Sequence, residues 1–77
     1  MIFLLQATMD PERLKMARAK LATDPYNLES WEVIARDAQN RRIEDSRNAF
    51  EEIVDFFPTS GKFWKMYIEQ EVKSLYY

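Results

Sequence analysis

The sequence predicts an all-α fold, in which antiparallel helical hairpins stack side by side as a short α-solenoid. Three observations predict it. Apolar residues recur at helical spacing in successive segments, Pro and Gly separate these segments, and one segment recurs further along the chain. The connections are short, which favours antiparallel neighbours. We expect helices at about residues 10–22, 28–40, 43–57 and 60–75.

The first two expected helices have clear start signals. Asp10-Pro11-Glu12 offers an N-cap, a Pro at the first helical position and an acid in the first turn. Asp24-Pro25 then breaks the helix, because the residue before Pro avoids the helical region. Asn27 can cap the second helix. The apolar stripes expected here are Leu14, Ala17 and Leu21, followed by Trp31, Ile34, Ala35 and Ala38.

The last two expected helices are separated by Pro58 and a turn. Glu44 and Asp45 favour the positive end of the third helix, and Ser60 can cap the fourth. Their apolar stripes are Ile43, Ala49, Phe50, Ile53, Val54 and Phe57, then Trp64, Tyr67, Ile68 and Leu75. The residues expected to be largely buried are Trp31, Phe50, Val54, Phe57, Trp64 and Ile68. Those expected to be exposed are Arg41, Arg42, Glu44 and Lys62.

Composition argues against an enzyme. The 77 residues include no Cys and no His, which excludes disulfides, thiolate or imidazole metal sites and His-based proton transfer within this sequence. The carboxylate pairs Glu51-Glu52 and Glu69/Glu71 are weak candidates for a metal, because adjacent helical residues point about 100° apart. No Gly-rich phosphate loop or nucleophile–His pair is present. We expect no catalytic residue, no metal and no cofactor.

Charge is nearly balanced, with 11 basic and 13 acidic side chains and a net charge of -2. This balance provides no strong attraction to nucleic acid or to a membrane surface. The densest basic cluster could contact RNA, but interleaved acids favour a solvated, salt-bridged face. The apolar run at residues 2–5 is too short for a membrane span. Residues 1–9 resemble no known motif and form a segment of unknown role. The candidate RNA contacts are Arg36, Arg41, Arg42 and Arg47.

An internal repeat is the most informative feature. Pro25 recurs as Pro58 and Trp31 recurs as Trp64, and both offsets are 33 residues (58 − 25 and 64 − 31). A period in the low thirties with two helices per unit is typical of helical solenoids. In such arrays each hairpin leaves one face uncovered, and the next hairpin covers it.

The segment RRIEDSRNAFEEIVDFFP, followed by WKMYIEQE, resembles the half-a-TPR repeat of RNA-processing scaffolds. Glu52 departs from the pattern, because the repeat usually has a basic residue there, and the local salt bridge is therefore not carried over. The residues that match the repeat motif are Trp64, Tyr67 and Glu71 in the first helix of a unit, and Arg47, Phe50, Glu51 and Pro58 in the second. Pro25 and Trp31 are the counterparts of Pro58 and Trp64 in the preceding unit.

The longer string DPYNLESWEVIARDAQNRRIEDSRNAFEEIVDFFPTSGKFWKMYIEQEVK, about residues 24–73, is similar to the first repeats of the suppressor-of-forked family. That family includes the largest subunit of cleavage stimulation factor. The resemblance implies a nuclear protein-interaction scaffold in pre-mRNA 3′-end cleavage and polyadenylation, with the other subunits of that machinery as partners and RNA reached through the complex. Two alternatives remain: an RNA-binding helical module, or a half-a-TPR scaffold of the spliceosome or of ribosomal RNA processing.

The repeat pattern also predicts an incomplete unit. Residues 10–77 would form a helical-repeat module of about one and a half repeats, with the second repeat truncated. Part of the apolar face of the last helix should then be exposed, and the chain should self-associate. The residues of that face are Trp64, Tyr67, Ile68, Val72 and Leu75.

Overall fold

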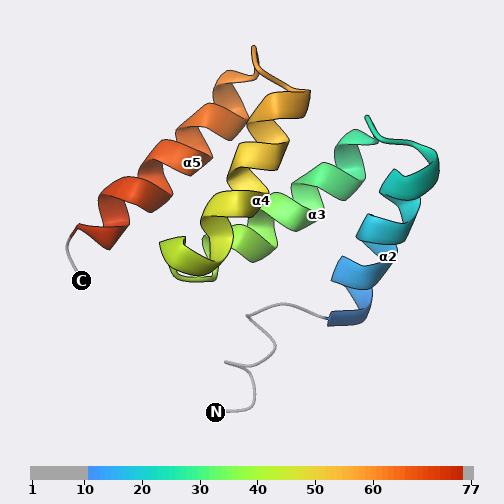
Figure 1. Cartoon of the computed structure of the whole chain (residues 1–77), viewed down its shortest axis with the longest axis horizontal. Coiled ribbons are helices and arrows are strands. Elements are labelled where there is room, and N and C mark those ends of the chain that lie inside the picture. Colours follow the sequence, from blue (N-terminus) through green and yellow to red (C-terminus); the bar gives the residue numbers. More distant parts are fainter. Residues whose placement is uncertain (1–10, 76–77) are drawn as a thin grey trace.

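The computed structural model describes residues 11–75, which form four α-helices and no strand (Figure 1). The helices are α2 (Pro11–Thr23), α3 (Leu28–Gln39), α4 (Ile43–Phe56) and α5 (Gly61–Ser74). Each bound lies within one residue of the range expected from the sequence, which confirms the all-α prediction. The expected cap Asp10 and the segment 1–9 lie outside the described residues.

Adjacent helices run in opposite directions and are joined by short connections (Figure 1). Each helix packs against its neighbour in the chain, and α3 also contacts α5. The order of the helices in space therefore follows their order in the sequence, from α2 at one end to α5 at the other. This arrangement is that of a helical-repeat array, in which contacts are mostly between neighbouring elements.

The expected caps of α3 and α5 are confirmed. The Asn27 side-chain oxygen accepts the backbone N–H of Ser30 at 2.9 Å, and the Ser60 hydroxyl accepts that of Phe63 at 3.3 Å. Each bond satisfies one of the free amides in the first turn of its helix. By contrast, Arg42 stands at the N-cap of α4 without a side-chain bond.

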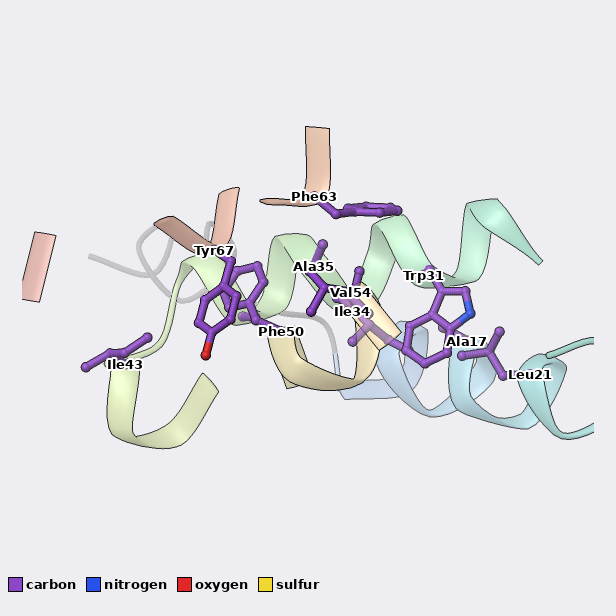
Figure 2. Packing of buried hydrophobic residues seen from close by; sticks show 12 residues of the cluster. Ala17, Leu21, Trp31, Ile34, Ala35, Ile43, Phe50, Val54, Phe63 and Tyr67 are labelled. Atoms are coloured by element: carbon purple, nitrogen blue, oxygen red, sulfur yellow. The ribbon is translucent and has the colours of Figure 1, made fainter. Parts of the chain in front are cut away.

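The hydrophobic core lies along the inner faces of the four helices (Figure 2). Trp31, Phe50 and Val54 are 2%, 0% and 4% exposed, as expected. Phe57 is partly buried and packs against this core. The buried apolar residues are Ala17, Leu21, Trp31, Ile34, Ala35, Ala38, Ile43, Phe50, Ile53, Val54, Phe63 and Tyr67. The four charged residues expected on the surface, Arg41, Arg42, Glu44 and Lys62, are exposed.

Two residues expected in the core are instead exposed, and that expectation was wrong. Trp64 and Ile68 have 39% and 57% of their surfaces open to solvent. Helix α5 buries the stripe that begins one residue earlier, Phe63, Tyr67 and Gln70. Adjacent helical positions point about 100° apart, and α5 has apolar side chains on both stripes. The apolar pattern alone therefore does not determine which stripe faces α4.

Candidate functional site

The Pro–Trp unit forms the same hydrogen bond in both repeats. The indole Nε1–H of Trp31 donates to the carbonyl oxygen of Pro25 at 2.7 Å, and that of Trp64 donates to Pro58 at 2.8 Å. The bond ties each indole to the turn that precedes its helix. The 33-residue offset is thus a repeat of structure as well as of sequence. The equal Pro-to-Trp spacing in the two copies was the signal in the sequence from which this bond could have been predicted.

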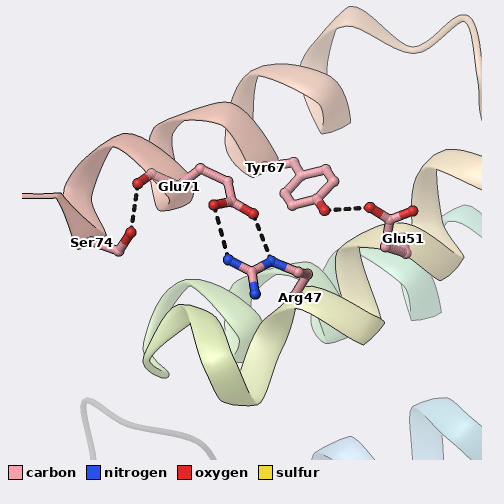
Figure 3. Close-up of polar contacts among 5 residues, drawn as sticks. All are labelled: Arg47, Glu51, Tyr67, Glu71 and Ser74. Atoms are coloured by element: carbon pink, nitrogen blue, oxygen red, sulfur yellow. Dashed lines mark hydrogen bonds and ion pairs between the residues drawn. The ribbon is translucent and has the colours of Figure 1, made fainter.

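The remaining repeat-motif residues meet across the interface of α4 and α5 (Figure 3). Arg47 donates two hydrogen bonds to the carboxylate of Glu71, from Nε at 2.8 Å and from Nη2 at 3.1 Å. This is the bidentate geometry that a planar guanidinium forms with a carboxylate. Both side chains are about half exposed, so the pair orients the two helices more than it stabilises them.

Tyr67 makes the second contact of this interface. Its ring stacks on Phe50 with the ring centroids 5.4 Å apart and an interplanar angle of 7°. Its hydroxyl donates a hydrogen bond to the carboxylate of Glu51 (Figure 3). Phe50 and Glu51 lie one turn beyond Arg47 on α4, and Tyr67 lies one turn before Glu71 on α5. Helical i, i+3 and i, i+4 spacing therefore brings all five side chains to one interface.

The ionisation of these groups fits a structural role. Burial, with the Glu51 hydrogen bond, raises the pKa of Tyr67 to about 12. The bond to Arg47 lowers the pKa of the Glu71 carboxyl, and the same bond raises the pKa of the Arg47 guanidinium. None of these groups exchanges protons near neutral pH, as a general acid or base must. In residues 11–75, no group of acidic side chains is arranged to hold a metal ion.

Glu52, the departure from the repeat motif, has a partner outside its own hairpin. Its carboxylate accepts a hydrogen bond from Arg18 of α2 at 3.0 Å. The Arg18 guanidinium also lies over the ring of Trp31, 5.9 Å from its centroid. Trp31 in turn packs against Phe56 of α4, with ring centroids 5.0 Å apart. The tryptophan of the first unit is thus covered by both α2 and α4.

The four arginines considered as RNA contacts do not form one surface. Arg47 is held by Glu71, and Arg41 donates from Nε to Asp37 at 2.8 Å. Arg36 lines a groove between α2 and α3, whereas Arg41 and Arg42 line a different groove beside the end of α5. The structure thus brings only Arg41 and Arg42 together.

An exposed apolar stripe runs along α5. Trp64, Ile68, Val72 and Leu75 are 39%, 57%, 45% and 80% exposed. The repeat pattern predicted that part of this face would meet solvent, and this is confirmed, except that Tyr67 is buried. At the 33-residue offset, Trp64 corresponds to Trp31, whose ring α4 covers. Within residues 11–75 no helix covers the corresponding stripe of α5.

Comparison with known proteins agrees with this geometry. A family model described as "Suppressor of forked protein (Suf)" matches residues 12–77. The chain belongs to the suppressor-of-forked family. The "Protein suppressor of forked" of Drosophila melanogaster is 46% identical over 66 residues, which cover 86% of this chain and 9% of that protein. The "Cleavage stimulation factor subunit 77" of Arabidopsis thaliana is 33% identical over 49 residues, 64% of this chain and 7% of that protein.

The chain spans less than a tenth of the length of these curated relatives of the suppressor-of-forked family. No solved structure matches it significantly. Of the helices within residues 11–75, none is long and apolar enough to cross a membrane.

Two interface residues were missed in the sequence, Phe63 and Gln70. Phe63 is 1% exposed and its ring lies 5.6 Å from that of Phe57. Gln70 is 4% exposed and donates from its side-chain amide to the carbonyl oxygen of Arg41. At the 33-residue offset these positions correspond to Ser30 and Asp37 of α3, which are buried although they are polar. Because an apolar-stripe criterion passes over polar residues, the offset gave no signal for Phe63 and Gln70 in the sequence.

Proposed function

We propose that this chain is a helical-repeat scaffold segment of a nuclear factor in mRNA 3′-end processing. The observation that carries the proposal is the family match over residues 12–77, together with a relative named as a cleavage stimulation factor subunit. The role is non-catalytic: the helices present surfaces to other subunits of a 3′-end processing complex. RNA is reached through that complex.

The exposed stripe of α5 supports this role by its shape and chemistry. In the first unit, the face of α3 around Trp31 is covered by α4, an antiparallel helix with aromatic residues toward its end. The stripe of α5 around Trp64 has the same place in the second unit. The stripe therefore fits a further antiparallel helix with an apolar and aromatic face, supplied by another subunit of the complex.

A co-purification with a functional readout tests the proposal. The tagged chain is used to capture material from nuclear extract, and the captured material is assayed for cleavage and polyadenylation of a reporter pre-mRNA. Ile68→Glu places a charge in the exposed stripe of α5. Lys65→Gln changes the net charge by the same amount on the same helix, outside the stripe, and is the matched control.

We expect the unchanged chain and Lys65→Gln to enrich the processing activity, and Ile68→Glu to lose it, because a charge in an apolar contact is costly to bury. Activity captured equally by all three chains would contradict the assignment of the stripe. No activity with any of them would contradict the scaffold role itself. Capture that depended entirely on added RNA would favour an RNA-binding module.

A further inference from the structure

A groove of about 530 Å³ lies between the connection of α3 to α4 and the last turns of α5. Gln70 holds the two sides together, since its nearly buried side-chain amide donates to the carbonyl oxygen of Arg41. The two sides come from segments that are 29 residues apart in the sequence. The volume is in the range of protein ligand pockets.

The groove is basic, although the chain as a whole is acidic. Arg41, Arg42 and Lys73 line it, and Glu44 is the one acid among the described residues that do so. The lining residues thus carry two more positive than negative charges (3 − 1), and the acids that pair with Arg41 and Arg42, Asp37 and Asp45, lie outside the lining. A concave surface with one prevailing sign of charge concentrates ligands of the opposite sign.

The cations of this groove retain free donors. The Nε of Arg41 donates to the buried Asp37. The terminal nitrogens of the same guanidinium have no hydrogen-bond partner within residues 11–75. The Arg42 side chain is 81% exposed, and its Nε lies 3.8 Å from Asp45. Lys73 makes no ion pair in the described part of the chain and is exposed. A fixed guanidinium beside an exposed ammonium is well suited to carboxylates.

Side-chain amides supply acceptors in the same groove. Asn40 donates its side-chain N–H to the carbonyl oxygen of Arg36, and Gln70 donates to that of Arg41. In the described structure, the amide oxygen of each accepts no hydrogen bond. Such oxygens can accept from the backbone N–H groups of an extended peptide.

We propose that this groove binds a short acidic peptide in an extended conformation. Its carboxylates contact Arg41, Arg42 and Lys73, and its backbone donates to the side-chain oxygen of the exposed Asn40. RNA fits the groove less well, because none of the described lining residues is aromatic and could stack on a base. The peptide belongs to a partner protein. Only this origin of the peptide, and not the binding itself, rests on the proposed scaffold function.

The test uses the purified full chain and fluorescence anisotropy at low and raised salt. The probe is a short fluorescein-labelled peptide of alternating Glu and Ser, with a Gln and Ser peptide as the neutral counterpart and a labelled oligouridylate as the RNA arm. Arg42→Glu/Lys73→Glu reverses two charges in the groove. Lys15→Glu/Lys65→Glu makes the same change in net charge at exposed positions outside it and is the matched control.

We expect the Glu peptide to bind and the neutral peptide not to bind. The groove variant should weaken binding about tenfold or more, and the control variant about twofold or less, because charge-assisted hydrogen bonds act at short range. Equal weakening by both variants would overturn the proposal, as would RNA bound more tightly than the peptide through the same residues. Neither result bears on the capture experiment, which probes the stripe of α5.

A second measurement needs no substitution. On the unchanged chain, NMR titration with the Glu peptide should shift the side-chain amide signals of Gln70 and Asn40 and the backbone amide of Arg41. Shifts confined to α2, or spread evenly over all exposed basic residues, would also overturn the proposal.

Discussion

The two tryptophans related by the 33-residue repeat offer a direct test of the packing. They form the same indole-to-carbonyl hydrogen bond, but Trp31 is 2% exposed and Trp64 is 39% exposed. A tryptophan buries up to ~250 Å², so the difference in exposed fraction corresponds to about 90 Å². At ~25 cal/mol per Å², this is about 2 kcal/mol of burial free energy.

We therefore expect Trp31→Ala to lower the free energy of unfolding by about 3–5 kcal/mol, and Trp64→Ala to lower it by about 2 kcal/mol less. A domain of this length has a total stability of only about 4–12 kcal/mol, so Trp31→Ala should remove a large share of it. Urea denaturation followed by circular dichroism gives both values, at a chain concentration low enough to keep the protein monomeric.

A loss at Trp64→Ala as large as that at Trp31→Ala would refute the assigned packing, because it would mean that the stripe of α5 is covered. If Trp31→Ala does not fold, the pair Trp31→Phe and Trp64→Phe replaces it. Both Phe variants remove the indole N–H bond, and Trp31→Phe should still be the more destabilising of the two, since it also leaves a cavity in the core.

Three further predictions follow from the helix ends, the exposed stripe and the buried phenol. Asn27→Ala and Ser60→Ala should each lower the free energy of unfolding by about 1 kcal/mol. Unchanged stability in both variants would contradict the capping assignment. Sedimentation should show the chain self-associating as its concentration rises and Ile68→Glu remaining monomeric; a monomeric unchanged chain would contradict this use of the stripe. The raised pKa of Tyr67, about 12 against an ordinary 10, stabilises the fold below pH 10, and this stabilisation is lost as the pH rises through the folded-state value. Tyr67→Phe should lack this alkaline loss in pH-dependent denaturation, and an unchanged profile would disprove the shift.

The sequence predicted burial well in α3 and poorly in α5, for a physical reason. Trp31 and its stripe lie on a helix that is covered on two sides, by α2 and by α4, and every residue of that stripe is buried. Helix α5 packs on one side, and its two apolar stripes compete for that side. Phe63 and Tyr67 lie on the packed side, where Tyr67 stacks on Phe50 and the ring of Phe63 packs at a tilt against Phe57, whereas Trp64 is exposed.

The residues of the candidate site were likewise predicted in part from the sequence and in part found only in the structure. The resemblance identified Arg47 and Glu71 as motif residues, and their contact across α4 and α5 gives the motif a structural meaning. The sequence gives Arg36, Arg41, Arg42 and Arg47 as its densest basic cluster, with interleaved acids that favour a salt-bridged face. The structure separates Arg36 from Arg41 and instead brings Lys73 of α5 to the groove.

The sequence by itself determined the helices, the caps of α3 and α5, the 33-residue repeat and the family. These features depend on residues a few positions apart: a Pro and the Trp six residues after it, or a cap and the amide three residues on. The tertiary structure alone decided which face of α5 is buried, that Glu52 pairs with Arg18, and that a basic groove forms beside Gln70. The last two contacts join residues 34 and 29 positions apart, and all three features depend on how whole helices pack rather than on any local pattern.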